Sequence, residues 1–533
     1  MTGLLANWTR LVGLIVRRDR WVLPVWILAC WAFCVGMAPM MPGLYSTPEE
    51  LAASTAMMGN PALVAMCGLV YKDPANLGTT YTQMMLVWSG LLVALMNILV
   101  VIRHTRTDED EGRVEVIRSL PTGRLASLAA IAAVIVAVDV VLALACGFGL
   151  AAFRIESMDL AGSLVYGAAL GACGLVFAAL ALVVIQLTDS ARTATAWTLA
   201  LLGGLYVLRA YGDVSSETAA RVSPLGLIQR TYAFDTNRWW PIAVLAVIAA
   251  CLFALAFAGN ARRDPGAGLL PQLRRGRAHA PAWMRTEWGL AVRLTRPGMI
   301  GWGAAVFLLS AAYGTVMPTM QDYIRSNAMY QQMTGADPTG DLTGSIVVTL
   351  MLLMAIVTAI PVLNTANRLV GEEHRGRMDY VLGRTVSRTS LFAGYAVLSV
   401  ATAVGLQLLT AGGFWLVAAA VMTTPVKASL VFGIAFNYLA ALLAFAGLGL
   451  FLAGAAKHLT WIGWGYLGVT FLVVYLGGVM NVSRLAQRFT PMGLLQRYPS
   501  ETFSWWPWVA LVVVGAALGV AGLVAYRRRD VTA

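Results

Sequence analysis

Two hydrophilic segments carry acidic and basic residues at the same spacing, at 103–124 and at 368–388. At an offset of 264 the matching residues are Asp108, Glu109, Gly112, Arg113, Glu115 and Arg124, against Glu372, Glu373, Gly376, Arg377, Asp379 and Arg388. Carboxylates and guanidinium groups form charge-assisted pairs whose geometry must be held, so we interpret both segments as surfaces that meet another protein. A solvated helix whose charges pair with one another is the alternative, and duplication by descent would also preserve the pattern.

No residue pattern predicts a catalytic or a metal site. The four histidines, His104, His279, His374 and His458, lack ligand spacing, and of the six cysteines only Cys67 lies in a predicted outer loop. Structural disulfides are therefore not expected. The sequence contains no G-x-x-x-x-G-K-[ST] phosphate loop, so if ATP drives this protein the ATPase must be another chain.

The two charged segments are part of a predicted duplication that extends over the whole chain. The Pro-x-Gly-Leu-x-Gln-Arg element at 224–230 returns at 491–497, at an offset of 267, and Trp-Trp-Pro at 239–241 and Arg-Arg-Asp at 262–264 return at an offset of 266. We expect one repeat over 1–264, a basic cytoplasmic linker over 265–281 and a second repeat over 282–533.

Composition places the chain in the membrane class, with 59% hydrophobic and 12% charged residues. Apolar runs long enough to cross a bilayer predict twelve transmembrane helices. They fall near 21–40, 83–102, 125–149, 161–187, 194–211, 241–258, 299–318, 344–366, 390–421, 428–454, 461–480 and 506–526. The fold expected is thus an all-α polytopic membrane protein of two parallel six-helix repeats, related by a pseudo-twofold axis along the membrane normal.

The distribution of basic residues predicts the orientation. With both termini in the cytoplasm, 27 of the 38 lysines and arginines lie inside and 11 outside. The net charge of +12 then reflects topology and contact with anionic lipid, and nucleic-acid binding is not expected. Each half also opens with apolar residues on one helical face, at Leu4, Trp8, Leu11 and Val12 and at Met284, Trp288, Ala291 and Val292. They predict amphipathic helices along the inner leaflet, or else cytoplasmic extensions of the first crossings.

Asp139 is the one acidic residue predicted at mid-helix, where a carboxylate costs a few kcal/mol and should face a cavity or a partner. It could bind a cationic substrate or carry a proton, or it could be a hydrogen-bonded aspartate between packed helices. Met84, Met85 and Met96 are candidates for an adaptable apolar substrate pathway, with lipid-facing packing as the alternative. The outer segments before the last helix of each half are candidate gates, at Gln229, Arg230, Gln496 and Arg497.

The acidic pair, the Gly-Arg step, the following acid and the Pro-x-Gly-Arg or Val-Ser-Arg before the third crossing resemble the coupling segment of ABC-2-type exporter permeases. In its duplicated form the chain resembles the twelve-helix permeases of actinobacterial tetronasin-resistance or polyketide antibiotic multidrug exporters. That resemblance implies a permease of the bacterial plasma membrane, without cofactor or catalytic residues of its own. A separate ATPase homodimer that binds ATP and Mg would dock on the two charged segments and drive export of small hydrophobic or amphiphilic compounds.

Two other classes of protein are alternatives. An ion-coupled secondary transporter of six-plus-six helices should carry several proton-relay residues within the membrane, and Asp139 is one. A polytopic membrane enzyme would need a catalytic cluster, and only Glu49, Glu50 and Asp73 in the outer loop offer carboxylates for it.

Overall fold

The computed structural model describes residues 3–71, 76–264, 266–270, 279, 281, 284, 286–326, 342–374, 376–383, 386–422, 426–475, 477, 482–496, 498 and 501–529. All regular structure within these ranges is helical. The chain forms two compact units, Met1–Arg275 and Gly276–Ala533, which are described separately below as the first and the second unit. Most of the predicted linker at 265–281 lies outside the described residues, so the predicted domain limits stay a prediction.

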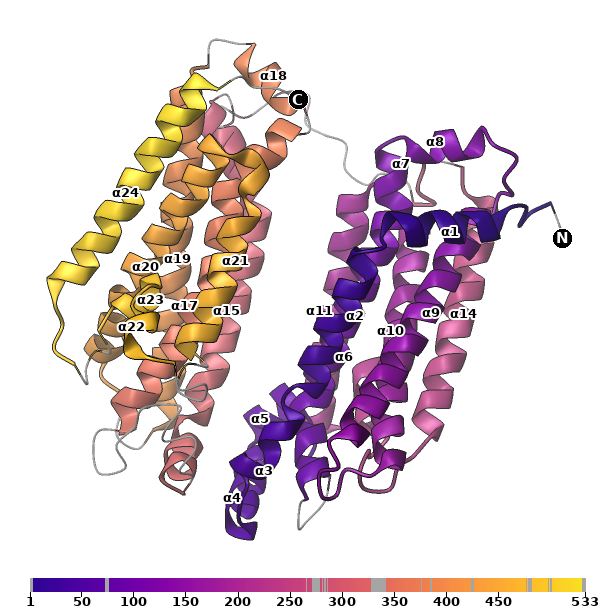
Figure 1. Ribbon diagram of the computed structural model, residues 1–533, viewed down its shortest axis with the longest axis horizontal. Helices are drawn as coiled ribbons and strands as arrows, with labels where there is room; N and C mark the ends of the chain where they lie inside the picture. The colour runs from indigo at the N-terminus through magenta and orange to yellow at the C-terminus, as the bar shows by residue number, and fades with distance from the viewer. Residues whose placement is uncertain are drawn as a thin grey trace. The chain divides into compact units, whose positions relative to one another are not determined.

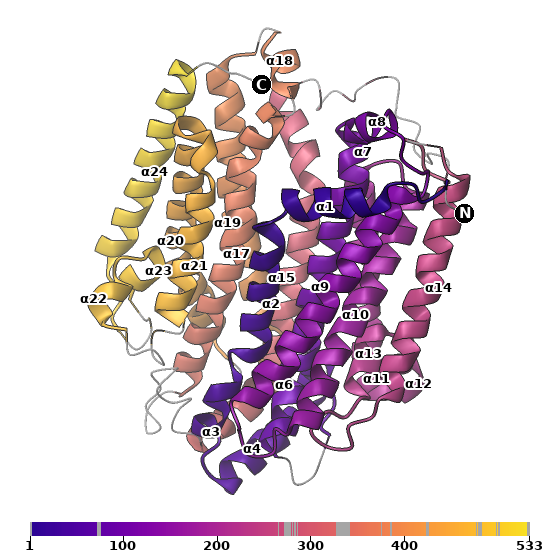
Figure 2. The same cartoon turned by 45° about the vertical axis from the view of Figure 1, so that its right-hand side comes forward.

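The first unit is a bundle of long helices with short helices at both ends (Figure 1). Its long helices are α2 (Val22–Val35), α6 (Leu77–Ile102), α9 (Ala126–Ala152), α10 (Leu160–Leu187), α11 (Ala191–Ser215) and α14 (Trp240–Arg262). One end, called the loop end in both units, carries α1 (Trp8–Arg18), α7 (Asp108–Asp110) and α8 (Arg113–Arg118) (Figures 1 and 2). The far end carries α3 (Met41–Leu44), α4 (Pro48–Met58), α5 (Pro61–Cys67), α12 (Glu217–Val222) and α13 (Pro224–Gln229).

The second unit has its elements in a similar order. Its long helices are α15 (Glu287–Ser326), α17 (Leu342–His374), α19 (Arg388–Val421), α20 (Ala428–Ala455) and α24 (Trp505–Arg528), with a shorter α21 (Trp461–Thr470). The short helix α18 (Arg377–Leu382) lies at its loop end, and α22 (Arg484–Gln487) and α23 (Pro491–Leu494) lie toward the far end. This order supports the predicted repeat; the placement of one half against the other stays a prediction.

Helices α10 and α20 form the cores of the two units. In the first unit α10 packs against α6, α9 and α14, and in the second α20 packs against α17, α19 and α24. Small residues allow the close approach of α20 and α24, since a Cβ added to Gly447 would lie 2.1 Å from the carbonyl oxygen of Gly515. This packing brings the end of the last helix of each unit next to the charged segment.

Ten helices among the described residues are long and apolar enough to cross a membrane. They comprise ten of the twelve predicted crossings; the two that do not qualify are the predicted crossings at 194–211 and 461–480. The corresponding helix α11 carries Arg192, Arg209 and Asp213, which lower its apolar character. Helix α21 has 10 residues and runs into a π turn at Phe471–Tyr475, so it is too short by itself.

The two predicted amphipathic helices differ. In the first unit α1 is a separate helix that lies across the ends of the long helices (Figures 1 and 2) and packs Leu11 against Ala126 and Ala130 of α9. In the second unit the corresponding face belongs to α15, which continues through Trp288 without interruption to Ser326. The expectation of a separate interfacial helix in the second half is therefore wrong, and that segment extends the first crossing.

Candidate functional site

The charged segment of the first unit is held by ion pairs from distant parts of the chain. Asp108 accepts from Arg18 of α1 and from Arg113, both at 2.7 Å. The hydrogen bond to Asp108 raises the pKa of the Arg18 guanidinium. Glu109 binds Arg263, at the end of α14, at 2.5 Å and Arg106 at 2.6 Å. The loop end of the first unit is thus fixed to α1 on one side and to α14 on the other.

The second unit repeats this construction with its own residues. Glu372 pairs with Arg377 at 3.0 Å, as Asp108 pairs with Arg113. Glu373 binds Arg529, just beyond the end of α24, at 2.5 Å, and Lys457 at 3.3 Å. Both units therefore join the second acid of the segment to an arginine at the end of the last helix.

Backbone features of the two segments match as well. Arg124 donates to the carbonyl oxygen of Arg263 at 3.0 Å, and Arg388 donates to that of Arg529 at 2.7 Å. The glycine of each Gly-Arg step has a left-handed backbone, with φ of 72° at Gly112 and 64° at Gly376. A residue with a Cβ would be strained there, so the glycine permits the turn that starts α8 and α18.

The acids that match at the offset of 264 mostly form ion pairs inside their own unit. The side chain of Glu109 is 11% exposed and that of Glu373 is 1% exposed. Glu115 is exposed, Arg113 and Arg377 are half exposed, and the side chain of Asp379 lies outside the described residues. These charges hold α8 and α18 in place, and whether they also contact another protein stays a prediction.

Two exposed side chains that the sequence interpretation overlooked lie on α8 and α18. Val116 is 68% exposed and Tyr380 is 82% exposed, and they match at the offset of 264. An apolar residue three positions after each Gly-Arg arginine was the available signal. It was missed because exposure cannot be read from a six-residue helix alone.

The candidate gate of the first unit lies at the far end and is buried. Gln229 and Arg230 are almost fully excluded from solvent. Gln229 donates to the carbonyl oxygen of Cys67 at 3.2 Å, and Arg230 lies 3.3 Å from Asp213. Arg209 also pairs with Asp213, at 3.2 Å.

Arg209 connects this cluster to the end of α5. Its guanidinium donates to the carbonyl oxygens of Ala65 at 2.7 Å and Met66 at 3.3 Å. It thus satisfies carbonyls that a helix end leaves unpaired. Sequence reasoning missed Arg209 because the carbonyl groups that it binds lie more than 140 positions away.

The candidate gate of the second unit is only partly described. Gln496 is half-buried, and its carbonyl oxygen accepts from Asn437 of α20 at 2.8 Å. Arg497 lies outside the described residues. The structure thus places Gln229 and Arg230 in a buried polar cluster, and the gating role of all four residues stays a prediction.

Asp139 lies at mid-helix in α9 and is 1% exposed. Its Oδ1 accepts from Asn97 of α6 at 2.9 Å, while Asp139 Oδ2 and Asn97 Oδ1 are buried without a hydrogen-bond partner. No ion pair to Asp139 is present among the residues that the structure describes. Position 403, its match in the second half, is alanine, so the pair has no counterpart there.

The three candidate pathway methionines all lie on α6. Met96 is buried and contacts Cys30, with 3.9 Å between the sulfurs, whereas Met84 and Met85 are half-buried. The hydroxyl of Tyr45 approaches the sulfur of Met84 at 3.6 Å. The structure therefore does not gather the methionines and Asp139 around one described cavity.

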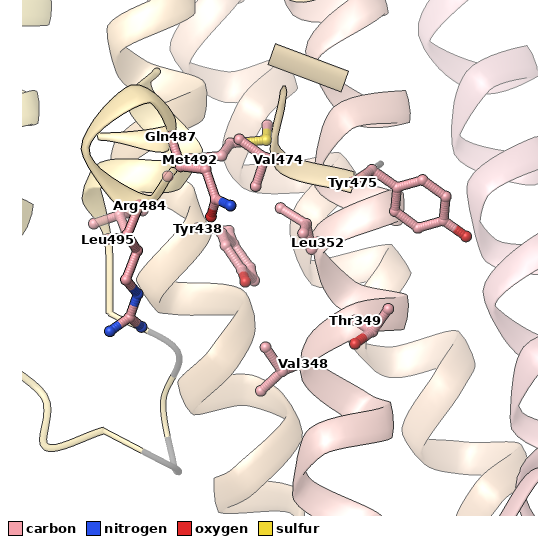
Figure 3. Close-up of a pocket in the computed structure, with 11 residues that line it drawn as sticks. Val348, Thr349, Leu352, Tyr438, Val474, Tyr475, Arg484, Gln487, Met492 and Leu495 are labelled. Carbon is pink, nitrogen blue, oxygen red and sulfur yellow. The ribbon is translucent and has the colours of Figure 1, made fainter. Parts of the chain in front are cut away.

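The second unit contains a cavity of about 50 Å³ between α17, α20 and the short helices of the far end (Figure 3). At the offset of 264, Met84 and Met85 correspond to Val348 and Thr349, which line it. Tyr438 and Gln487 also line it, and the ring of Tyr475 points away (Figure 3). This cavity adjoins the second gate element through Met492, Gly493 and Leu495.

Comparisons with known proteins indicate the family of this chain. The family described as "Multidrug efflux system permease Rv1217c, C-terminal domain" matches residues 9–260 and 284–527. The multidrug efflux system permease protein Rv1217c of Mycobacterium tuberculosis is 32% identical over 540 aligned positions, which cover 98% of this chain and 94% of that relative. With ten helices suited to span a membrane in the described part of the chain and family matches over 9–260 and 284–527, the chain belongs to the Rv1217c family of multidrug efflux system permeases.

Proposed function

We propose that this chain is the permease subunit of an ATP-binding cassette exporter. It moves hydrophobic or amphiphilic compounds, such as antibiotics and other drugs, out of a bacterial cell. A separate ATPase homodimer holds ATP and Mg and docks at the loop ends, which face the cytoplasm together with both chain termini. The relative's printed name, a multidrug efflux system permease, supports the substrate class.

The observation that carries this proposal is the repeated construction of the two loop ends. Each unit ties its charged segment to the end of its last helix, through Glu109 and Arg263 or through Glu373 and Arg529. These ion pairs are short and largely buried, and in each unit a further hydrogen bond reaches the backbone carbonyl oxygen of the same arginine. A displacement of α8 or α18 is therefore transmitted to the helix bundle. A solvated charged loop would need no such connection.

The same arrangement leaves part of α8 and of α18 exposed, where a partner protein could dock. Val116 and Tyr380 project from α8 and α18 with most of their surface in water. Exposed apolar side chains framed by charges are typical of protein contact sites, where aromatic residues often dominate the binding energy. We assign each as the anchor of one ATPase subunit. The two anchors differ in size, so the two docking contacts are unequal.

In the proposed cycle, closure of the ATPase dimer moves both docking helices and switches the halves from inward-open to outward-open. Substrate is pumped only if it binds the two states with different affinity. The buried cluster around Arg209 and Gln229 would keep the far end of the first unit closed at rest. Asp139, Met84, Met85 and Met96 remain the candidate contacts of the substrate.

Ion-coupled transport is the second candidate, because of one specific observation. Asp139 is buried in the span without a cationic partner among the described residues, as a residue that takes up and releases a proton would be. A single such residue, bonded to Asn97 and absent from the second half, is equally the arrangement of a structural contact between α6 and α9. The similar construction of the two loop ends favours ATP-driven export over ion-coupled transport.

Affinity purification of the full chain in mild detergent from its native host tests the proposal. We expect co-elution of two ATPase copies per chain and ATPase activity that a hydrophobic drug stimulates. If the chain elutes alone and no ATPase restores drug transport in proteoliposomes, while a proton gradient does, the ion-coupled alternative replaces it.

A further inference from the structure

The second unit carries an apolar groove between α15 and α19, which lie side by side (Figure 2). Its volume is about 730 Å³. Nine of its ten lining residues are apolar, and the tenth is Arg296. Gly303 lies on its floor, where an added Cβ would meet Leu409 at 3.1 Å. The groove is therefore an elongated apolar surface with one positive charge.

The charge lies near the loop end of α15. Trp288, in the first turn of that helix, donates to Ser390 at the start of α19 at 3.1 Å, which places the start of α15 at the loop end. Arg296 precedes the predicted span 299–318 by three residues, about 5 Å along a helix. Its guanidinium thus lies at the depth of lipid headgroups if the loop end faces the cytoplasm.

Several arginines at the loop ends of both units form ion pairs, and Arg296 differs from them. In the first unit Arg18 pairs with Asp108 at 2.7 Å, and Arg103 pairs with Asp19 at 3.0 Å. In α15 no acidic residue occurs between Glu287 and Asp322. Arg296 is exposed and forms no ion pair with any residue that the structure describes. Its charge is available to an anion from outside the chain.

We infer that this groove binds an anionic phospholipid of the cytoplasmic leaflet, with an acyl chain along α15 and α19 and the phosphate at Arg296. The apolar wall suits a hydrocarbon chain, and the single guanidinium at the headgroup level suits a phosphate. The cytoplasmic leaflet is the one rich in anionic lipid. The leaflet assignment rests on the orientation proposed above, but the site itself does not depend on ATP or on drug transport.

Photolabelling of the full chain in phosphatidylcholine nanodiscs tests the site. Two diazirine lipids with the same acyl chains are compared, one a phosphatidylglycerol and one a phosphatidylcholine, and labelled peptides are mapped by mass spectrometry. We expect the phosphatidylglycerol probe to label α15 and α19 about fivefold more strongly, which corresponds to the roughly 1 kcal/mol that one cation contributes near an anionic surface.

Two pairs of variants separate charge from shape. Arg296→Gln should abolish the headgroup preference and leave labelling by the phosphatidylcholine probe, whereas Arg293→Gln, whose guanidinium approaches the Met284 sulfur instead, should leave both unchanged. Gly303→Leu should fill the groove and remove labelling by both probes. Gly301→Leu, on the same helix with open space around its Cβ position, is the matched control.

Equal labelling by the two probes in the unaltered chain would overturn the inference. So would labelling that Gly303→Leu leaves intact. Absence of any label on α15 and α19 would show that the groove is covered by protein, and would overturn it too. None of these results bears on the ATPase proposal, since the assay contains neither ATP nor a partner subunit.

Discussion

Truncation of Tyr380 to alanine tests the docking surface most directly. A tyrosine side chain buries roughly 150–250 Å² on full burial. Because Tyr380 is 82% exposed, docking would remove roughly 120–200 Å² from water, worth about 3–5 kcal/mol at 25 cal/mol/Å². Ordering and desolvation offset part of this gain, so we expect Tyr380→Ala to cost about 2 kcal/mol. That is a loss of roughly 30-fold in affinity for the ATPase subunit.

The assay is binding of the purified ATPase partner to the permease in nanodiscs, with drug-stimulated ATPase activity as a second readout. Phe489→Ala is the matched control, because Phe489 is an aromatic residue of nearly the same exposure, 83%, next to the short helices of the far end. Val116→Ala removes two methyl groups at a 68% exposed position and should cost about 1 kcal/mol, roughly fivefold in affinity. If Tyr380→Ala binds the ATPase as tightly as Phe489→Ala does, the assignment of α18 as a docking helix is refuted.

Three further predictions concern buried polar groups. Glu373→Gln should lower the free energy of unfolding by roughly 3 kcal/mol, because it leaves Arg529 without its buried partner. Thermal unfolding in detergent measures this, and a shift no larger than that of Glu217→Gln, in an exposed pair, would contradict it. Asp139→Asn should retain folding and drug transport, since the amide can keep the contact to Asn97; a folded variant that has lost transport would assign the carboxyl a role in the cycle. Arg209→Gln should release the end of α5 and speed modification of Cys67 by a membrane-impermeant maleimide by about tenfold, as expected for a loss of about 1.4 kcal/mol. An unchanged rate in intact cells would show that Arg209 does not hold the far end closed.

Long apolar helices were predictable from the sequence because a span needs an uninterrupted run of apolar residues, whatever it packs against. Helices α9 and α10 begin and end within a few residues of the predicted limits. At the start of α15 the sequence left two possibilities open, a separate interfacial helix or an extension of the first crossing, because the amphipathic face around Trp288 looks the same in both; the structure has the extension.

The charged segments were likewise only partly predictable from the sequence. Their spacing marked Asp108, Glu109, Glu372 and Glu373 as members of charge-assisted pairs; we expected the partners on another protein, with pairing inside the segment as the alternative, and in the structure all four acids bind arginines of their own unit. The sequence did not reveal that the second acid of each pair is taken up by the last helix. Arg263 and Arg529 lie more than 150 residues from their acids, and only the folded chain brings them together.

By itself, then, the sequence placed this protein in a membrane and showed matching motifs at offsets of 264 to 267, because hydrophobicity and motif spacing are properties of order along the chain. Only the tertiary structure decided which charges are buried and which side chains remain available. Burial depends on the packing of the folded unit, in which the acids of the charged segments turn inward while Val116 and Tyr380 stay exposed. The same packing leaves Arg296 beside an apolar groove, which no local pattern in α15 records.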